Sequence, residues 1–340
     1  MPPSSPSIPR SPDASSRSRP IVVIGSINTD FVHRVPRLPG PGETVTAAGF
    51  DVLPGGKGAN QAVAAARLGA RVSMVGRVGF DLGFGVLDRF EREGIDTRHV
   101  RRTSGVPTGQ AQIFVDPNGE NCIVVSPGAN AHVSAADVDA AAPLLRSAAV
   151  VLLQLEIPLV TVRHALSLCR RLGVPTVLDP APVPPKGPPR ALFAADYLTP
   201  NQPEALQLTG RQHSRGVRLS DPKPVATALH SRGANTVILK LGARGAAIAA
   251  GDGRFQIVRP FRVRVTDSTA AGDAFNAAFA VALADGMSLK DAVRFANAAG
   301  ALCCTKQGAQ PALPTRSAVE RLLRAFSPSL GGRHHKVIDA

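Results

Sequence analysis

The chain has 340 residues, 44% of them hydrophobic, which is enough material for one large domain with a small appendage. No stretch approaches the roughly 20 apolar residues of a membrane helix, and the four cysteines show neither metal-type spacing nor a preceding secretory signal, so we expect reduced thiols and a cytoplasmic protein. The net charge of +14 is dispersed, and with one Tyr and no Trp it indicates a basic surface that favours anionic substrates rather than a nucleic-acid platform.

The two ends of the chain are expected to lie outside the folded domain. Residues 1–20 are mostly Pro, Ser and Arg with little apolar surface to bury, which predicts a disordered basic tail. A segment rich in Ser and Arg is also typical of an organelle transit peptide, but this one lacks a clear amphipathic face. We expect a single domain over residues 21–325, followed by a flexible tail at 326–340.

The first strand is predicted at residues 21–25, where a continuous apolar run is typical of a strand buried on both faces. Asn28 and Asp30 follow it. Because open α/β sheets bind ligands at the carboxyl edge of their strands, this pair is suited to bind hydroxyl groups of a polar substrate, with ordinary loop polarity as the alternative. Residues 31–53 alternate weakly between prolines and predict short strands of a separate small sheet.

A glycine-rich segment at 55–61 (GGKGANQ) leads into an alanine-rich helix that stops at Gly69. Its spacing is not that of a P-loop, which has four residues between its first glycine and Gly-Lys. The paired glycines allow close backbone approach, and Lys57 and Asn60 offer donors to an oxygen-rich ligand. A plain helix-entry turn is the alternative.

Strands and helices alternate from residue 71, with a strand at 72–75 and a helix at about 83–93. The pattern is interrupted where runs at 110–115 and 121–125 flank DPNG at 116–119, a strong hairpin signal. The segments of about 31–54 and 108–127 are therefore expected to form a lid beside the main sheet.

The alternation then resumes, with strands predicted at 149–155, 174–178, 197–199 and 236–241 and helices opening at Ser134, at Pro158 and after Asn201. Glu156 lies at the carboxyl end of the first of these strands. Asn201 and Glu204 fit a helix capping box, so a structural role is an alternative to ligand binding. The glycines at 242 and 245 would allow a base or a phosphate to approach the backbone closely, or merely form a tight turn.

The most informative segment is 267–275, which joins an alternating run at 261–265 to a helix at 274–284. A helix start offers unpaired N–H groups and a positive dipole to an anion, and Asp273 can act as a base on whatever meets that anion. The chemistry indicated is phosphoryl transfer, with simple capping by Asp273 as the alternative. A second helix is predicted at 289–304.

In this order, the motifs resemble the ribokinase family of PfkB-type carbohydrate kinases. The resemblance covers residues 21 to about 323 and is carried by GSINTD (25–30), GGKGANQ (55–61), GEN (119–121) with GAN (128–130), NQPE (201–204) and DSTAAGD (267–273). It implies a ribokinase-like α/β fold, in which a central, mostly parallel sheet is flanked by helices and carries a small β-sheet lid. It also implies a homodimer formed through the lid.

The resemblance implies transfer of phosphate from ATP to the 5-hydroxyl of D-ribose, with Mg²⁺ accompanying ATP. Asp273 would be the general base, and the backbone N–H groups of Ala270, Ala271, Gly272 and Asp273 would form an anion hole. The residues that match ribose-binding positions are Asn28, Asp30, Gly56, Lys57, Asn60, Glu156 and Asp273. Those that match nucleotide-contacting positions are Asn201, Lys240, Leu241, Gly242, Ala243, Arg244, Gly245, Gly272 and Asn297, while Glu204 matches the acidic position near magnesium and phosphate.

The resemblance further implies a site for K⁺, as a monovalent activator, beside the anion hole. The matching positions, which would contribute mostly backbone carbonyls, are Asp267, Thr269, Cys303, Lys306, Gly308 and Ala312. Ala312 stands where the family often has serine, so one hydroxyl ligand is missing.

Two kinds of alternative remain. Another sugar or nucleoside kinase of the family, such as a deoxyribokinase, fructokinase or adenosine kinase, differs by contacts that the sequence does not reveal. An inactive binding or regulatory relative is disfavoured because Asp273 and the segment containing Gly56 and Lys57 are retained. Neither nucleic acid nor a membrane is expected as a partner.

Overall fold

The computed structural model describes residues 19–80, 85–185, 187, 189–211 and 218–326. Residues 1–18 of the predicted N-terminal tail and 327–340 of the C-terminal tail lie outside this range, so both tails stay predictions. Within the described residues, no helix combines the length and the apolar character needed to cross a membrane.

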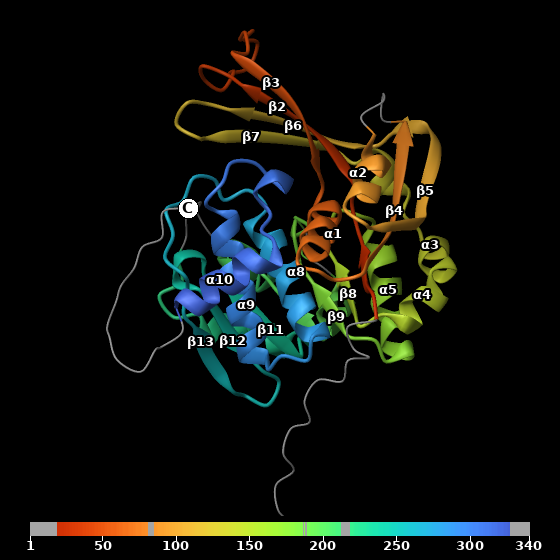
Figure 1. Ribbon diagram of the computed structural model, residues 1–340, viewed down its shortest axis with the longest axis vertical. Helices are drawn as coiled ribbons and strands as arrows, with labels where there is room; N and C mark the ends of the chain where they lie inside the picture. Colours follow the sequence, from red (N-terminus) through yellow and green to blue (C-terminus); the bar gives the residue numbers. More distant parts are fainter. Residues whose placement is uncertain (1–18, 81–84, 186, 188, 212–217, 327–340) are drawn as a thin grey trace, which may run out of the picture.

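A mostly parallel sheet forms the centre of the described part of the molecule (Figure 1). Nine strands follow the order β13-β12-β11-β10-β9-β8-β1-β4-β5, and only the pairs β11–β12 and β12–β13 are antiparallel. This confirms the predicted sheet type. The strands are β1 (Ile21–Ile24), β4 (Val72–Phe80), β5 (Asp96–Pro107), β8 (Val150–Leu153), β9 (Thr176–Leu178), β10 (Tyr197–Leu198), β11 (Thr236–Lys240), β12 (Ala246–Ala249) and β13 (Phe255–Val258).

Helices cover both faces of this sheet, which explains why the neighbouring strands β1 and β8 are apolar at every position. Ile21 and Val23 of β1 point into one core, and Val22 and Ile24 point into the other. The first core is covered by α1 (Lys57–Arg67), α2 (Val86–Arg92), α8 (Ala271–Ala284), α9 (Leu289–Cys303) and α10 (Arg316–Ala325). The second is covered by α3 (Ala135–Ala140), α4 (Ala142–Ser147), α5 (Leu159–Leu172), α6 (Gln202–Leu208) and α7 (Lys223–Ser231).

Helix α8 is buried along most of its length, and its composition explains how it fits. It packs against both α1 and α9. Ala274, Ala277, Ala278 and Ala280 are fully buried, and their small side chains allow the neighbouring helices to approach closely. The first turn of α8 is thereby fixed relative to the start of α1, and these two helix starts carry Asp273 and Lys57.

A second sheet projects beyond the main body (Figure 1). Its order is β3-β2-β6-β7, with β2–β6 parallel and the outer pairs antiparallel. Its strands are β2 (Asn28–Arg34), β3 (Gly49–Gly55), β6 (Gly109–Val115) and β7 (Asn121–Ser126). The predicted hairpin is present, with Gly119 N donating to Asp116 O at 3.0 Å. β2 begins four residues after β1 ends, so the lid is connected directly to the carboxyl end of β1.

Several boundaries differ from the sequence prediction. Strand β4 runs on to Phe80, and β5, β12 and β13 were not predicted. The alternating run 261–265 is not a strand, apart from an isolated bridge at Val263. Pro260, which has no N–H to donate to a ladder, follows β13 and ends the pairing there. The predicted helix at about 83–93 is α2 (Val86–Arg92), and residues 81–84 lie outside the described range.

Candidate active site

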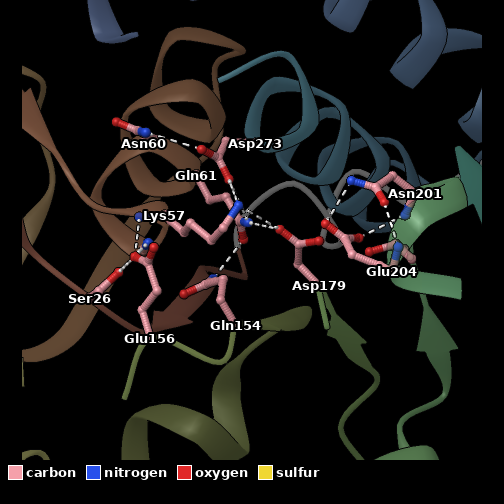
Figure 2. Close-up of polar contacts among 12 residues, drawn as sticks. Ser26, Lys57, Asn60, Gln61, Gln154, Glu156, Asp179, Asn201, Glu204 and Asp273 are labelled. Carbon is pink, nitrogen blue, oxygen red and sulfur yellow. Dashed lines mark hydrogen bonds and ion pairs between the residues drawn. The ribbon is translucent and has the colours of Figure 1, made fainter. Parts of the chain in front are cut away.

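The candidate site lies at the carboxyl ends of the parallel strands, where the polar side chains of Figure 2 meet. Glu156 comes shortly after β8, Asp179 directly after β9, and Lys240 is the last residue of β11. Parallel strands present their carboxyl ends at one edge of a sheet, where open α/β folds bind ligands. Residues more than 200 positions apart in the chain meet here.

Asp273 lies in the first turn of α8 and is held by fixed donors. Asn60 Nδ2 donates to its Oδ2 at 3.0 Å, and Gln61 Nε2 donates to its Oδ1 at 3.1 Å. Lys57 Nζ lies 4.0 Å from Oδ1. Burial raises the pKa of Asp273 although the Lys57 charge opposes that shift. The result is an oriented carboxylate with increased proton affinity, as a general base needs.

Glu156 connects the start of α1 with the end of β1. Its Oε2 accepts hydrogen bonds from Ser26 Oγ at 2.6 Å and from the backbone N–H of Lys57 at 3.0 Å. Burial disfavours the charge of Lys57, but Asp273, Asp179, Glu156 and Glu204 together raise its pKa above the usual value. Lys57 therefore carries a permanent positive charge beside Asp273.

The predicted sugar-binding residues include two buried acceptors without a partner among the described residues, Asp30 Oδ1 and Asn60 Oδ1. Burial, and then the charges of Glu156 and Asp273, raise the pKa of Asp30 to about 7. A β-carbon on Gly55 would lie 2.0 Å from the Asp30 carboxylate, so only glycine leaves it room. Buried acceptors of this kind demand donors, and sugar hydroxyls can provide them.

Asn28 is oriented by the GAN motif. Asn130 Nδ2 donates to Asn28 Oδ1 at 2.7 Å and to Ile27 O at 3.1 Å, and Ile27 N donates back to Asn130 Oδ1 at 2.9 Å. The amide nitrogen of Asn28 is thereby turned away from Asn130. The structure thus brings all seven predicted sugar-binding positions to the region where the lid meets α1 and α8.

A cleft of about 920 Å³ opens from Asp273 along the start of α8. One wall is apolar and is formed by Phe261, Val263, Val265 and Ala301. Of the predicted nucleotide-contacting residues, Asn201, Glu204, Lys240, Gly242, Ala243, Gly245, Gly272 and Asn297 line it. The side chains of Leu241 and Arg244 do not: Leu241 is packed in the core, and Arg244 Nη2 donates to Gln202 Oε1 at 3.0 Å.

Asn201 and Glu204 form the capping box that the sequence offered as an alternative. Asn201 Oδ1 accepts from Glu204 N at 2.9 Å, and Glu204 Oε2 accepts from Asn201 N at 2.7 Å. Burial raises the pKa of Glu204. Both residues also line the cleft, so capping and ligand binding are compatible.

The predicted anion hole lies at the junction of this cleft with α8. Ala270 precedes the helix with a φ of 58°, and it is the one described residue other than glycine with a positive φ. Ala270, Ala271 and Gly272 all line the cleft. Left-handed turns before a helix start direct successive N–H groups toward one point, which is the geometry of an anion site.

The predicted cation loop is held together mainly by Asp267. Its Oδ1 accepts from Thr269 N and its Oδ2 from Gly308 N, both at 2.8 Å. Cys303 Sγ donates to Thr269 O at 3.5 Å, and Lys306 N donates to Cys303 O at 3.4 Å. Ala312 is buried in a neighbouring 3₁₀ turn (Gln310–Ala312). In the described part of the chain no three His, Cys, Asp or Glu side chains cluster to hold a metal, so a cation here would need backbone oxygens.

Four polar residues at the centre of the site were not assigned a role from the sequence: Ser26, Gln61, Gln154 and Asp179. Gln154 Nε2 donates to Gln61 Oε1 at 2.6 Å, and Gln61 Nε2 donates to Asp179 Oδ2 at 3.3 Å as well as to Asp273. Each lies within a quoted motif or at the carboxyl end of a predicted strand. Position at that edge was the available signal.

Comparisons with known proteins agree with this geometry. Residues 18–316 match the family described as pfkB family carbohydrate kinase. A ribokinase of Haemophilus influenzae is 41% identical over 87% of this chain and 95% of its own, and a deoxyribokinase of Salmonella typhi is 34% identical over 87% and 95%. The structure of Arabidopsis thaliana ribokinase complexed with ribose and ATP superimposes with a TM-score of 0.80, at 34% identity over 91% of this chain and 99% of that one.

The chain belongs to the pfkB family of carbohydrate kinases. Its fold is ribokinase-like, as predicted, and it is an ATP-binding sugar kinase. Kinases of this family generally use ATP together with Mg²⁺.

Proposed function

We propose that this protein transfers the γ-phosphoryl group of ATP to the 5-hydroxyl of D-ribose, giving ribose 5-phosphate. The observation that carries the proposal is the position of Asp273, which lies between the cleft and the unpartnered oxygens of Asp30 and Asn60. The similarity to ribokinases supports ribose as the sugar. Loss of the 2-hydroxyl would remove one donor from a site rich in buried acceptors, which disfavours 2-deoxyribose.

In the proposed reaction Asp273 accepts the proton of the sugar hydroxyl as its oxygen attacks the γ-phosphorus. The N–H groups at 270–273 stabilise charge on the transferring group. Mg²⁺ prefers oxygen ligands. Glu204, in the wall of the cleft, would hold Mg²⁺ through a water molecule, and the ion would neutralise phosphate charge. The positive charge of Lys57 offsets the negative charge of Asp273 before this carboxylate accepts the proton.

A panel of acceptors tests the proposal. With ATP consumption coupled to a spectrophotometric readout, D-ribose is expected to give the highest kcat/KM, ahead of 2-deoxyribose, fructose and adenosine. A higher value for one of the other three would assign the protein to that activity. Absence of turnover with all four would indicate an inactive relative.

We also propose that the loop around Asp267 binds K⁺ as an activator. An ion that lies beside the anion hole without touching ATP can act only by fixing the loop at 270–272 so that its N–H groups converge. We expect activity to rise when KCl replaces choline chloride at constant ionic strength, with Na⁺ and Li⁺ substituting poorly. Ala312→Ser should lower the K⁺ concentration for half-activation at a similar maximal rate. Full activity without K⁺ would contradict the proposal.

We further propose a homodimer formed through the lid. Strand β7 presents Ile123, Val124 and Val125 to solvent, and β3 presents Phe50, each about half exposed. Because successive strand residues point to opposite faces, Ile123 and Val125 share one face of the lid and Val124 and Phe50 share the other. Both faces of the lid thus expose large apolar side chains of the kind found at protein interfaces. Sedimentation as a monomer at micromolar concentration would contradict this assembly.

A further inference from the structure

Asp179 is the buried centre of the charge cluster, although neither the motifs nor the proposed reaction uses it. Its side chain is 2% exposed. Oδ1 accepts a hydrogen bond from Lys240 Nζ at 3.0 Å, and Oδ2 accepts from Gln61 Nε2 at 3.3 Å and lies 3.7 Å from Lys57 Nζ. The two oxygens of one carboxylate therefore separate two ammonium groups. One of these, Lys57, lies beside the proposed base, and the other is Lys240.

Lys240 brings its charge to the opposite side of the cluster, at the start of α8. A β-carbon on Gly272 would lie 3.5 Å from Lys240 Nζ, so the ammonium is next to the backbone that forms the proposed anion hole. Its side chain is only 14% exposed, and it lines the cleft. A buried ammonium beside a positive helix end is unfavourable unless anions flank it. Asp179 provides one, and the cleft is open to a second.

We propose that Lys240 contacts the phosphoryl group during its transfer, and that Asp179 is a positioning residue that holds Lys240 against the start of α8. This inference rests on the proposed function. In the step, a bond forms between the sugar oxygen and the γ-phosphorus, the bond from that phosphorus to the ADP oxygen breaks, and the proton goes to Asp273. Lys240 keeps its protons and contributes only charge, which is worth most where phosphate charge spreads over the equatorial oxygens.

The two lysines have different surroundings, and Lys57 alone would not supply the positive charge that the phosphoryl group needs. Lys57 is drawn toward Asp273 and Asp179, so its charge is committed to keeping the base ionised. Among the described residues Lys240 forms an ion pair with Asp179, and Glu204 is close enough to interact with its charge. Lys240 also borders the cleft, so it can contact phosphate while it still contacts Asp179. Lys57 thus keeps the base ionised, and Lys240 contacts the phosphoryl group.

Kinetics of four variants test the inference: Lys240→Met, Lys240→Arg, Asp179→Asn and the double variant Asp179→Asn/Lys240→Met. Lys240→Met should lower kcat roughly 100-fold, as expected for one transition-state donor, while the sugar KM changes less than about threefold. Lys240→Arg keeps the charge and should restore most of the lost rate. The double variant should be no slower than Lys240→Met, because Asp179 acts through Lys240. It also removes the buried carboxylate that Lys240→Met leaves without its ammonium partner, so it should fold even if Lys240→Met does not.

Calorimetry of nucleotide binding adds a readout that needs no sugar. With Mg²⁺ present, Lys240→Met, or the double variant in its place, should weaken binding of the β,γ-imido analogue of ATP about tenfold, and that of ADP by less than about twofold. Equal losses for both nucleotides would overturn the inference, as would a Lys240→Met kcat above about a third of wild type. Multiplying effects in the double variant would overturn the role of Asp179. If wild type phosphorylates no sugar, the proposed function fails, while the calorimetric contrast still decides the contact with the γ-phosphoryl group.

Discussion

Asp273→Asn is expected to lower kcat by roughly 10² to 10⁴, the range for removal of a general base. The amide keeps the shape of the side chain but has no basic oxygen to accept the hydroxyl proton. The fold should persist, because burial already disfavours the charged form of Asp273 and raises its pKa, and the variant removes that buried charge. Measurement of kcat and of sugar affinity, the latter by calorimetry, separates the chemical step from binding.

The pH dependence gives an independent check. Because the pKa of Asp273 is raised, wild-type kcat should fall as pH falls through that pKa and the base becomes protonated. The residual rate of Asp273→Asn should lack this acidic limb. Asp252→Asn, at an exposed aspartate that pairs with Arg254, is the matched control and should leave kcat unchanged. An Asp273→Asn variant that retained a third of the wild-type rate would remove Asp273 from the role of base.

Asp30→Asn is expected to weaken sugar binding and to stabilise the protein. A charge-assisted hydrogen bond to a sugar hydroxyl is worth about 1.5–3 kcal/mol, so the sugar KM should rise roughly 10- to 100-fold. Wild-type KM should also rise as pH falls below 7, because the Asp30 carboxylate becomes protonated there. The variant should show no such rise.

The stability effect follows from the sign of the same shift. The pKa of Asp30 is raised from 3.8 to about 7, so between these values the folded protein holds a proton that the unfolded chain has released. The free energy of unfolding of wild type therefore falls as pH rises through this window, by up to about 1.4 kcal/mol per pKa unit. Asp30→Asn avoids that loss, and its melting temperature should exceed that of wild type at pH 8 but hardly at pH 4. Asp51→Asn, at a more exposed lid aspartate, is the control; a similar gain there would refute the assignment to Asp30.

Much of the fold was predictable because local rules and the global fold agree. Apolar runs located β1, β8, β9 and β11, and the DPNG turn located the β6–β7 hairpin. Strands β12 and β13 were missed because β12 is four residues of Ala and Ile, a composition equally compatible with a helix. Residues 261–265 alternate as a strand would but form none apart from the bridge at Val263, because periodicity alone does not ensure that a partner strand is available.

The site was predictable where one motif contains its chemistry, as at Asp273 and Lys57. The role of Asp179 was not predictable, because it depends on contacts with Lys240 and Gln61. These residues are distant in the chain, and the order of the strands in the sheet brings them together. Leu241 and Arg244 show the converse. They share a segment with residues that line the cleft, but Leu241 is packed in the core and Arg244, in the 3₁₀ turn Gly242–Arg244, donates to Gln202.

The backbone conformation of Ala270 also affects the conformational freedom of the loop before α8. A left-handed φ is unfavourable by roughly 1–2 kcal/mol for alanine, whereas glycine adopts it freely. Glycine would also visit many other conformations, so alanine narrows the ensemble once the surrounding structure imposes this angle. Alanine thus removes part of the freedom of the loop before α8 ahead of nucleotide binding, and the proposed K⁺ would complete its ordering. The part of the ordering entropy that is lost during folding is not lost again at each binding event, so more of the binding free energy comes from contacts with phosphate.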